Sequence, residues 1–432
     1  MTLSGQHLPD SAERTRGVST LVVGAGQAGL QLAVSLRDLG EEGPITLIGD
    51  ESHTPYQRPP LSKTFLAGET ETGALAFRHP HFYTKAGIEL ITGDGVSDLA
   101  LTPDGPAGSG TARTGSGQTL AFDRLALTLG AAPRRLTLPG SDLGGVCYLG
   151  TLDDAARIRS LLGSAKDVVV VGGGFIGLEA AAVARSQGKA VTVVEAADRL
   201  MTRAVAPMVS EFYRAAHTKR GTTVMLSAQV SGFDGAEGRV ITVLLTDGSQ
   251  LAADLVLVGV GVVPRTGLAE RIGLDCDGGI VVDSEARTSE PYVVAAGDCT
   301  VRPHPLTGQG RVRLESVQNA VAQARAAACS LVGRPEHART VPWFWSDQDD
   351  LKLQIAGLSA GYDHHVLRGE PRSEQFSVLY YQDEQLIAVD AVNSPVDYLV
   401  VRKALTQGVN LPVDLAGNSA TPLKAVLASA AG

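Results

Sequence analysis

Strongly apolar, β-branched segments alternate with segments of helical spacing along the first two thirds of the chain. The first such unit runs from Leu21 to Asp50 and contains a strand, a glycine-rich turn, a helix and a second strand. A second unit of the same order begins at Asp167 and ends at Glu195. Apolar runs of this kind are typical of strands that are buried in a parallel sheet and joined by crossover helices. The pattern therefore predicts two β-α-β units.

Each unit is followed by short strands and a further buried strand. In the first half these strands lie within residues 88–129. Residues 102–118 among them are rich in Gly, Ser, Thr and Pro, which predicts an exposed loop with little order. In the second half, a helix near residues 205–220 precedes the strands. This internal repeat predicts two homologous nucleotide-binding domains, and strands and helices beyond residue 341 predict a third, α+β domain.

A glycine-rich turn of the pattern G-x-G-x-x-G joins the first strand of each unit to its helix. The first glycine permits the tight turn, the second lets backbone amides approach a pyrophosphate, and the third lets helix and strand pack closely. Two dinucleotides on one chain indicate electron transfer between them. The glycines are Gly24, Gly26 and Gly29 in the first turn, here called the proximal turn, and Gly172, Gly174 and Gly177 in the second, the distal turn.

A carboxylate ends the second strand of each unit. Glu195 lies eighteen residues after Gly177, where a carboxylate accepts hydrogen bonds from a ribose 2′-hydroxyl and repels a 2′-phosphate. We therefore expect NADH there, although Arg199 and Arg203 keep NADPH open as an alternative. In the first unit the acid is displaced by one residue, and Asp50 is the candidate for the ribose of the first nucleotide.

The segment Gln57-Arg-Pro-Pro-Leu-Ser-Lys63 predicts a stiff entry to a helix, with Ser62 or a neighbour as its cap. A rigid Lys63 near a cofactor could hold a developing anion, and a solvated lysine at a helix start is the alternative. The segment contains no cysteine, which excludes a dithiol–disulfide pair beside a flavin at this place.

Composition excludes several classes of function. The 432 residues contain 37 Lys and Arg against 46 Asp and Glu, and this net charge of −9 argues against nucleic acid as the main partner. Residues 1–16 show no secretory signal, and the longest apolar run, residues 255–263, is too short to span a membrane, so we expect a cytoplasmic protein. Without a C-x-x-C pattern we expect no metal or iron–sulfur site and buried thiols at Cys147, Cys276, Cys299 and Cys329.

From about residue 18 to its end, the chain resembles the FAD-dependent ferredoxin reductases of bacterial oxygenase systems. The matching strings are GAGQAG (24–29), RPPLSK (58–63), TLGAAPR (128–134), GGGFIGLE (172–179), the segment ending in AAGDC (295–299), ESVQNA (315–320), PWFWSDQ (342–348) and PLKA (422–425). The resemblance implies an α/β fold of two homologous dinucleotide-binding domains, glutathione-reductase-like, plus the C-terminal α+β domain. It divides the chain into a disordered tail (1–16), a FAD-binding domain (17–132 and 266–338), an NAD-binding domain (133–265) and the C-terminal domain (339–432).

The resemblance also implies roles for individual residues. Lys63 would lie near flavin N5 and pair with Glu179, and Trp345 would stack near the nicotinamide or flavin ring, with a core position in the third domain as the alternative. Val317 would offer a backbone N–H to the flavin C2 carbonyl. The proximal turn with Ala28 and Asp50 would hold FAD, and the distal turn with Glu195 would hold NADH. The other expected FAD contacts are Arg58, Val96 through its backbone, and Asp298 at the ribityl or pyrophosphate part.

One position departs from the family pattern. Where the family has an arginine that contacts FAD, this chain has Gly150. That contact is missing unless Arg134 or Arg135 replaces it, so we expect somewhat weaker FAD retention or a changed contact on the adenine side.

The implied activity is hydride transfer from NADH to FAD, followed by single-electron transfer to an acidic two-iron two-sulfur ferredoxin that feeds a monooxygenase or dioxygenase. Candidate docking residues are Arg325, Arg402, Lys403 and Lys424, each of which could instead be simply solvated. We expect a monomer or weak dimer. The alternative function is NADH-dependent reduction of a small molecule, as in an oxidase or monodehydroascorbate reductase. A DNA-binding flavoprotein is disfavoured by the net charge, and a pseudo-enzyme by the presence of Lys63, Glu179 and Trp345.

Overall fold

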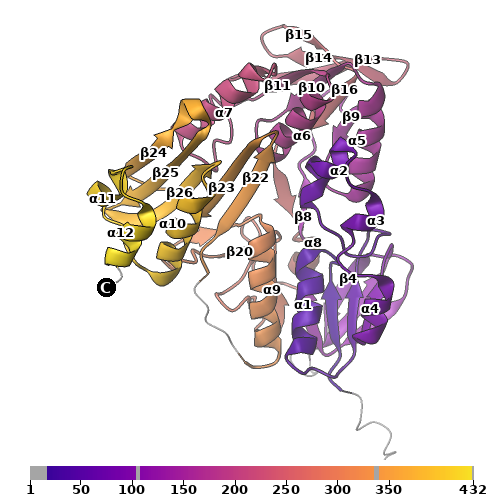
Figure 1. The fold of residues 1–432 in the computed structure, drawn as a ribbon. Coiled ribbons are helices and arrows are strands. Elements are labelled where there is room, and N and C mark those ends of the chain that lie inside the picture. Colours follow the sequence, from indigo (N-terminus) through magenta and orange to yellow (C-terminus); the bar gives the residue numbers. More distant parts are fainter. Residues whose placement is uncertain (1–16, 104–107, 335–339, 431–432) are drawn as a thin grey trace, which may run out of the picture.

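A computed structural model describes residues 17–103, 108–334 and 340–430 (Figure 1). The predicted tail at residues 1–16 lies outside the described residues, as do residues 104–107 of the predicted loop. The described chain forms two dinucleotide-binding units built on parallel sheets and a C-terminal unit built on an antiparallel sheet, so the predicted fold class is confirmed.

The first unit is a five-stranded parallel sheet in the order β3-β2-β1-β7-β19. Helices α1 (Gln27–Asp38) and α9 (Val317–Leu331) pack side by side (Figure 1). Their alanine-rich faces bury Ala28, Ala324 and Ala328 in one apolar cluster with the strands. The strands are β1 (Thr20–Val23), β2 (Ile45–Ile48), β3 (Ile88–Ile91), β7 (Arg124–Leu127) and β19 (Val293–Ala295).

The second unit repeats this arrangement with the order β12-β11-β10-β16-β9, also parallel throughout. In each unit the strand before the glycine turn lies at the centre of the sheet, as the buried apolar runs predict. The elements are β9 (Val146–Tyr148), α5 (Leu152–Ser164), β10 (Asp167–Val171), α6 (Phe175–Ser186), β11 (Ala190–Val194), α7 (Pro207–Lys219), β12 (Thr223–Met225) and β16 (Leu255–Val258).

Each unit also carries a small three-stranded antiparallel sheet, which completes the predicted repeat. The prediction of a loop at residues 102–118 is wrong in part, because Gly110–Thr114 is the middle strand β5 of the first of these sheets. Its inward side chains are small, with Ala112 fully buried, so its composition resembles that of a loop. The other strands are β4 (Val96–Leu101) and β6 (Thr119–Phe122) in the first unit and β13 (Val230–Ala236), β14 (Arg239–Leu245) and β15 (Gln250–Ala252) in the second.

Two strands carry the chain between the units. β8 (Ala131–Pro133) leads into the second unit and β17 (Val262–Pro264) leads back, and the two pair antiparallel. The expected domain boundary at residues 132/133 lies within β8, and the one at 265/266 lies just after β17. The remaining short elements before residue 334 are α2 (Thr64–Ala67), α3 (Thr72–Leu75), α4 (Pro80–Lys85), α8 (Gly267–Arg271), β18 (Ile280–Val281), β20 (Thr300–Pro303) and β21 (Arg311–Val312).

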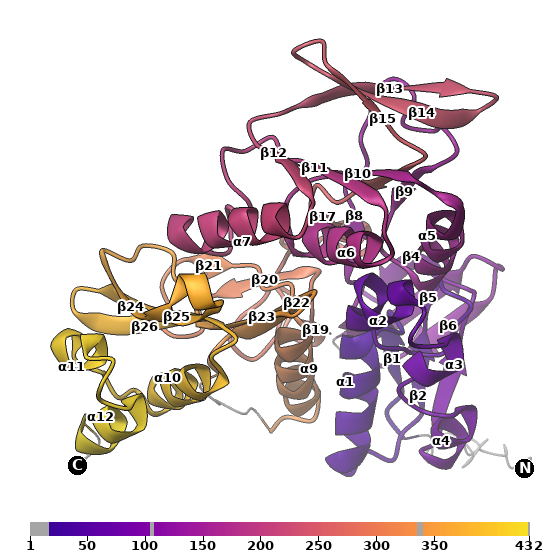
Figure 2. The ribbon, with the colours of Figure 1, turned by 45° about the horizontal axis from the view of Figure 1, so that its top comes forward.

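The C-terminal sheet has the order β22-β23-β26-β25-β24 and is antiparallel throughout. Its alternating residues face two different partners: Val378 and Tyr380 pack on the second unit, whereas Leu379 and Tyr381 pack on the domain's own helices. Figure 2 shows α7 on one side of this sheet and α10 on the other. The elements are β22 (Trp343–Gln348), β23 (Leu351–Gly357), β24 (His364–Glu370), β25 (Gln375–Gln382), β26 (Gln385–Val392), α10 (Pro395–Gln407), α11 (Val413–Gly417) and α12 (Leu423–Ala430).

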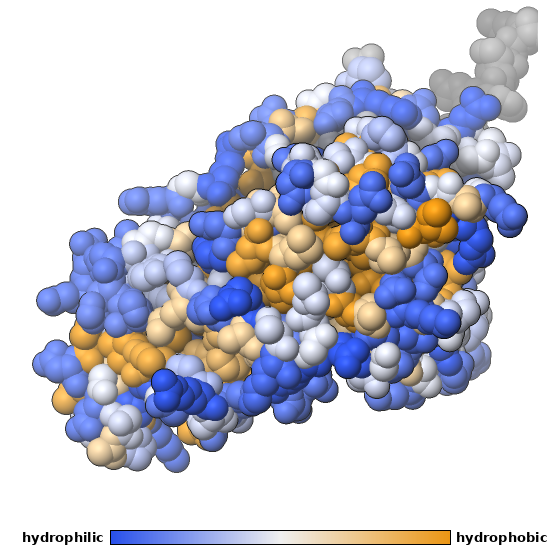
Figure 3. Space-filling view, turned by 90° about the horizontal axis from the view of Figure 1, so that it is seen from above, coloured by the Kyte–Doolittle hydropathy of each residue, from blue (hydrophilic) through white to orange (hydrophobic). Residues whose placement is uncertain are grey.

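The surface is mixed in character. Figure 3 shows apolar side chains gathered across the middle of one face, surrounded by hydrophilic ones. Within the described ranges, no helix is both long enough and apolar enough to cross a membrane.

Of the four cysteines, Cys147, Cys299 and Cys329 are buried as expected, whereas Cys276 is partly exposed.

Arg220, the residue after α7, joins the second unit to the C-terminal sheet. Its guanidinium lies 2.6 Å from Asp350 and 2.6 Å from Glu374, and its side chain is 19% exposed. We expect Arg220→Ala to lower the free energy of unfolding by about 2 kcal/mol, because it leaves two carboxylates without their shared partner. Urea unfolding measures the change. Arg214→Ala, which removes an exposed ion pair with Glu211 on the same helix, should cost at most about 0.5 kcal/mol. Equal losses in both variants would contradict the role of Arg220.

Candidate functional site

Of the three glycines in the proximal turn, Gly26 alone faces open space. Gly24 has a φ of +110°, and a Cβ there would lie 2.2 Å from the carbonyl oxygen of Thr128. A Cβ on Gly29 would lie 2.0 Å from the oxygen of Gly24, so α1 packs tightly on its strand. At Gly26, by contrast, a Cβ would meet nothing within 4 Å. Helix α1 begins there with no side-chain cap, so its first amides face this open space and form a cradle for an anion.

The distal turn repeats this geometry. Gly172 has a φ of +106°, and Cβ atoms on Gly172 and Gly177 would each lie 2.4 Å from a backbone oxygen, whereas Gly174 faces open space. Helix α6 begins there, also without a side-chain cap. The carboxylate of Glu195 accepts hydrogen bonds from the backbone N–H of Gly173 (2.6 Å) and of Ala197 (2.7 Å). It is thereby held beside the turn, where the ribose of a dinucleotide lies in this motif.

A pocket of about 310 Å³ extends from the proximal turn between Asp50, Val96 and the α8 segment. The Asp50 carboxylate lies 2.8 Å from Arg265, which comes from the chain returning from the second unit. The structure thus brings together the turn, Asp50 and Val96, as expected for the adenosine side of the first nucleotide.

A buried ion pair joins the two units. Lys63 Nζ lies 2.8 Å from Glu179 Oε2, and their side chains are 16% and 3% exposed. Glu179 is the fifth residue of α6, two residues after Gly177 of the distal turn, whereas Lys63 lies between the 3-10 helix Pro59–Ser62 and α2. The Ser62 hydroxyl donates to Glu179 Oε2 (2.5 Å) and the Ser346 hydroxyl to Oε1 (2.6 Å). The sequence predicts that Ser62 or a neighbour caps a helix. In the structure Ser62 does not cap a helix but helps to satisfy the buried carboxylate of Glu179.

Arg58 lies in a second polar cluster between the units. Its guanidinium contacts Glu51, the Tyr56 hydroxyl (3.0 Å) and the carbonyl oxygen of Gly150 (2.6 Å). A Cβ on Gly150 would lie 2.7 Å from the Pro133 ring, so an arginine at position 150 would require that ring to move.

Arg134 and Arg135 are the two candidates, according to the sequence, for replacing the contact that is missing at Gly150. Arg134 is exposed and bonds through its backbone N–H to Gly261, and Arg135 lies over the Tyr148 ring. The expected role of Arg134 toward FAD stays a prediction.

Asp298 is partly buried, and its carboxylate has no hydrogen-bond partner among the described residues. Burial and the nearby Glu315 raise its pKa to about 6, opposed by Arg58 and Arg313. A partly buried carboxylate without a partner fits a ligand that donates hydroxyl groups. The preceding Gly297 is fixed by a hydrogen bond from its N–H to Gln323 of α9.

Helix α9 begins at Val317, because Ser316 is its N-cap. The Ser316 hydroxyl accepts a hydrogen bond from the N–H of Asn319, which leaves the N–H of Val317 for a ligand.

Trp345 lies on strand β22, partly exposed and near Trp343 and Phe344. Phe344 contacts Phe175, the first residue of α6, with 4.6 Å between the ring centres. Strand β22 therefore lies against the distal turn, although the stacking expected of Trp345 on a cofactor ring stays a prediction.

Several residues of the site were not identified from the sequence. Ser62 and Ser346 are uncharged residues that become important only because Glu179 is buried between them. Both occur in strings quoted above, PPLSK and FWSDQ, and that is the signal by which they could have been found. Beyond Ser346, a buried chain of hydrogen bonds continues to Gln348 and His217.

The residues present fit two dinucleotides: each of the two open anion cradles has a carboxylate beside it, Asp298 is partly buried without a hydrogen-bond partner among the described residues, and Lys63 is held between the two units. This constellation defines an oxidoreductase that uses a flavin and a nicotinamide dinucleotide.

Comparisons with known proteins agree. Residues 18–324 match the pyridine nucleotide-disulphide oxidoreductase family and residues 343–427 a reductase C-terminal domain. The chain is 43% identical to rhodocoxin reductase of Rhodococcus erythropolis (95% of each chain) and 39% identical to putidaredoxin reductase of Pseudomonas putida (95% and 97%). A solved covalent complex of putidaredoxin reductase with putidaredoxin superposes with a TM-score of 0.91 at 37% identity, covering 96% and 99%.

The chain therefore belongs to the pyridine nucleotide-disulphide oxidoreductase family, and the resemblance inferred from its motifs is confirmed. The family binds FAD and uses NAD(P)H, which agrees with the two dinucleotides predicted from the glycine turns and with the cofactors implied by the resemblance.

The open glycines give a test of which turn holds which cofactor. We expect Gly26→Ala to fold normally, because its Cβ meets no protein atom, but to weaken FAD binding by about 1–3 kcal/mol, because the methyl group occupies the place of the pyrophosphate. Gly174→Ala should weaken NADH binding similarly and leave FAD binding unchanged. Circular dichroism and FAD and NADH dissociation constants measure this. Loss of FAD from Gly174→Ala, or its full retention by Gly26→Ala, would contradict the assignment.

Proposed function

We propose that the protein is an NADH-dependent ferredoxin reductase. The observation that carries the proposal is the buried Lys63–Glu179 ion pair, which links the flavin site of the first unit to the turn that holds the nicotinamide dinucleotide in the second. When bound, FAD would supply the chemistry, taking a hydride from NADH and releasing electrons singly to an iron–sulfur protein.

The protein's own residues bind and orient these groups. The proximal turn with Ala28, Asp50, Val96, Asp298 and the N-terminus of α9 would hold FAD, with Arg58 steadying the segment that leads to Lys63. Lys63 would place its positive charge where negative charge grows on the ring, and Glu179 keeps the ammonium group in place. The α9 N-terminus, with the Val317 N–H directed outward, would add a fixed positive dipole.

The preference for NADH rests on Glu195 and on the surroundings of the distal turn. Arg199, which sequence alone left open as a partner for a 2′-phosphate, donates instead to the carbonyl oxygens of Val205 and Thr202 and to the Ser210 hydroxyl. Its guanidinium is therefore occupied within the fold, and of the two arginines Arg203 alone is left for NADPH.

A ferredoxin is the proposed electron acceptor because the relatives named above are reductases and one of them was solved in complex with putidaredoxin. The candidate docking residues lie on three helices of one side: Arg325 on α9, Arg402 and Lys403 on α10, and Lys424 on α12 (Figure 1). Helix α10 also exposes Val396 and Leu399, and an apolar centre beside basic residues is typical of a docking surface. Arg402 is not simply solvated, since its guanidinium lies 4.4 Å from the centre of the Trp343 ring.

Reduction of a small molecule through a cysteine is disfavoured by the burial of Cys299, the thiol next to Asp298. Burial raises its pKa to about 12, so it stays protonated and unreactive.

The experiment that tests the proposed function is an anaerobic titration of the FAD-loaded protein with NADH and with NADPH, followed by cytochrome c reduction with and without an added two-iron ferredoxin. We expect NADH to bleach the flavin absorbance at lower concentration than NADPH, and cytochrome c reduction to depend on the ferredoxin. If NADH leaves the flavin oxidised, the proposal fails. If cytochrome c is reduced equally fast without ferredoxin, the proposal that a ferredoxin is the electron acceptor fails.

The docking residues give a separate prediction. Arg325→Glu should raise the KM for ferredoxin by about tenfold and leave the KM for NADH unchanged, because it places a like charge opposite an acidic partner. Arg113→Glu on β5, also exposed, should change neither constant. Equal effects of Arg325→Glu on both constants would overturn the docking assignment.

A further inference from the structure

A chain of buried hydrogen bonds leads away from the Lys63–Glu179 ion pair into the interface with the C-terminal sheet. It runs from Glu179 through Ser346 and Gln348 to His217, and each of these four side chains is at most 4% exposed. The Gln348 amide donates to Ser346 Oγ at 3.2 Å, and His217 Nε2 lies 2.8 Å from Gln348 Oε1. The residues come from three separate segments: α6, β22 and α7.

The chain has a defined direction. Ser346 Oγ uses its one proton to donate to Glu179, so it must accept from its other neighbour, and the Gln348 amide nitrogen supplies that donor. The amide oxygen of Gln348 then faces His217, whose Nε2 must carry a proton. Every donor in the chain therefore points toward the carboxylate of Glu179.

The surroundings favour a neutral histidine in this chain. Burial lowers the pKa of His217, and so does the positive charge of Arg220, whereas the hydrogen bond to Gln348 and the charge of Asp349 oppose the shift. A neutral ring with its proton on Nε2 donates to Gln348 without adding a charge.

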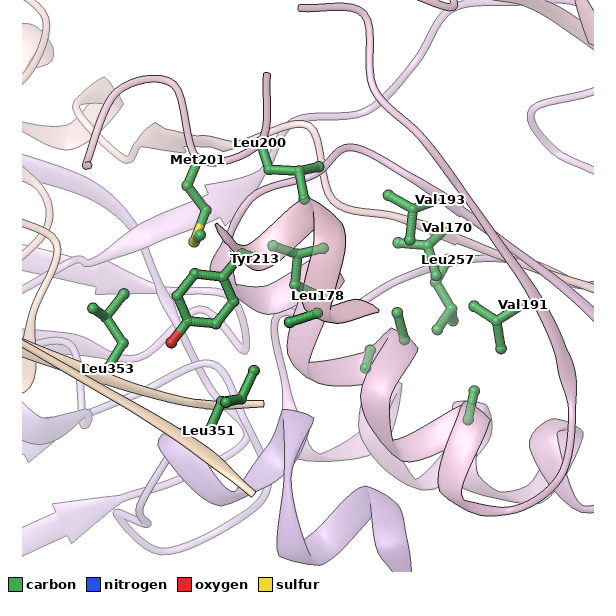
Figure 4. Packing of buried hydrophobic residues seen from close by; sticks show 14 of the residues in the cluster. Val170, Leu178, Val191, Val193, Leu200, Met201, Tyr213, Leu257, Leu351 and Leu353 are labelled. Atoms are coloured by element: carbon green, nitrogen blue, oxygen red, sulfur yellow. The ribbon is translucent and has the colours of Figure 1, made fainter. Parts of the chain in front are cut away.

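The same glutamine is linked to the distal turn. The Gln348 amide also lies 3.8 Å from the sulfur of Met201, and the backbone N–H of Met201 donates to Gly173 in the distal turn. Met201 has a φ of +49°, a strained value for a residue with a side chain, so its position is fixed by these neighbours. Figure 4 shows Met201 and Tyr213 facing Leu351 and Leu353 of the C-terminal sheet, which enclose this region in apolar side chains.

We propose that Gln348 and His217 are positioning residues for the Lys63–Glu179 ion pair: they direct the Ser346 hydroxyl at Glu179 and so hold Lys63 in place at the flavin. This role rests on the proposed function. It gives the C-terminal sheet a part in the chemistry of the flavin site, through side chains that touch neither cofactor.

The substitution Gln348→Glu separates positioning from packing. It keeps the size of the side chain and its bond to His217, but the new carboxylate accepts where the amide donated, so it draws the Ser346 proton away from Glu179. We expect the rate constant for reduction of bound FAD at saturating NADH to fall about tenfold, the equivalent of one hydrogen bond to a charged group, and the midpoint potential of the flavin to change. Dissociation constants for FAD and NADH should stay as in the wild type.

Two further variants complete the test. Gln382→Glu makes the same change at the exposed end of β25 and should alter neither rate nor potential. His217→Gln retains a donor toward Gln348 and should preserve the potential, whereas His217→Phe removes the donor and should shift it as Gln348→Glu does. An unchanged potential and rate in Gln348→Glu, or equal changes in Gln382→Glu, would overturn the proposal. A wild-type flavin that NADH does not reduce would instead overturn the proposed function.

A measurement on the wild type does not depend on the folding of any variant. Nitrogen-15 NMR of the histidine rings, with the His217 signal assigned by its absence in His217→Gln, reports which ring nitrogen carries the proton. We expect a proton on Nε2 at neutral pH. A neutral ring protonated on Nδ1 would reverse the direction of the chain and contradict the proposal.

Discussion

The ion pair between Lys63 and Glu179 is the interaction on which the rest of the site depends. Each partner belongs to a different dinucleotide-binding unit, and both charges are largely removed from water. Breaking a buried pair by removing one partner typically costs about 3–5 kcal/mol, because the remaining charge is left without compensation. In the native state the hydroxyls of Ser62 and Ser346 help to stabilise the buried charge of Glu179, since together with Lys63 they satisfy both carboxylate oxygens.

The repeated fold explains how such a pair arises. Both glycine turns open at the centre of a five-stranded parallel sheet, and both leave one glycine facing empty space. In the second unit, the helix after the turn carries Glu179 toward the first unit. The C-terminal sheet also contacts this junction: the Ser346 hydroxyl donates to Glu179, and Phe344 contacts Phe175, the first residue of α6. The site is therefore a property of all three domains.

Much of the fold could be predicted from the sequence, because β-branched runs and glycine spacing are local signals. The turns, the central strands and the repeat depend on residues near one another in the chain. The strand β5 could not be recognised, since Gly110, Ala112 and Thr114 are small residues whose partners lie in β4 and β6. Family motifs identified Lys63 and Glu179, and the structure places them together.

Other parts of the site depend on contacts between distant segments, which no local pattern records. In the sequence Ser62 resembles a helix cap, whereas in the fold its hydroxyl donates a hydrogen bond to the carboxylate of Glu179. Gly150 looks like a lost contact, whereas in the structure its carbonyl oxygen accepts from Arg58, and a Cβ added at this position would lie 2.7 Å from the Pro133 ring. His217 lies 131 residues before Gln348, and only the packing of α7 on the C-terminal sheet brings them together.

The central claim, that the fixed charge of Lys63 assists reduction of the flavin, is tested most directly by stopped-flow measurement of FAD reduction by saturating NADH in Lys63→Met. This substitution keeps a long apolar side chain and removes the charge. We predict that the rate constant falls by about 10²–10³, the effect usual for loss of one preorganised charge-stabilising group, while FAD stays bound. A rate constant equal to that of the wild type would contradict the account.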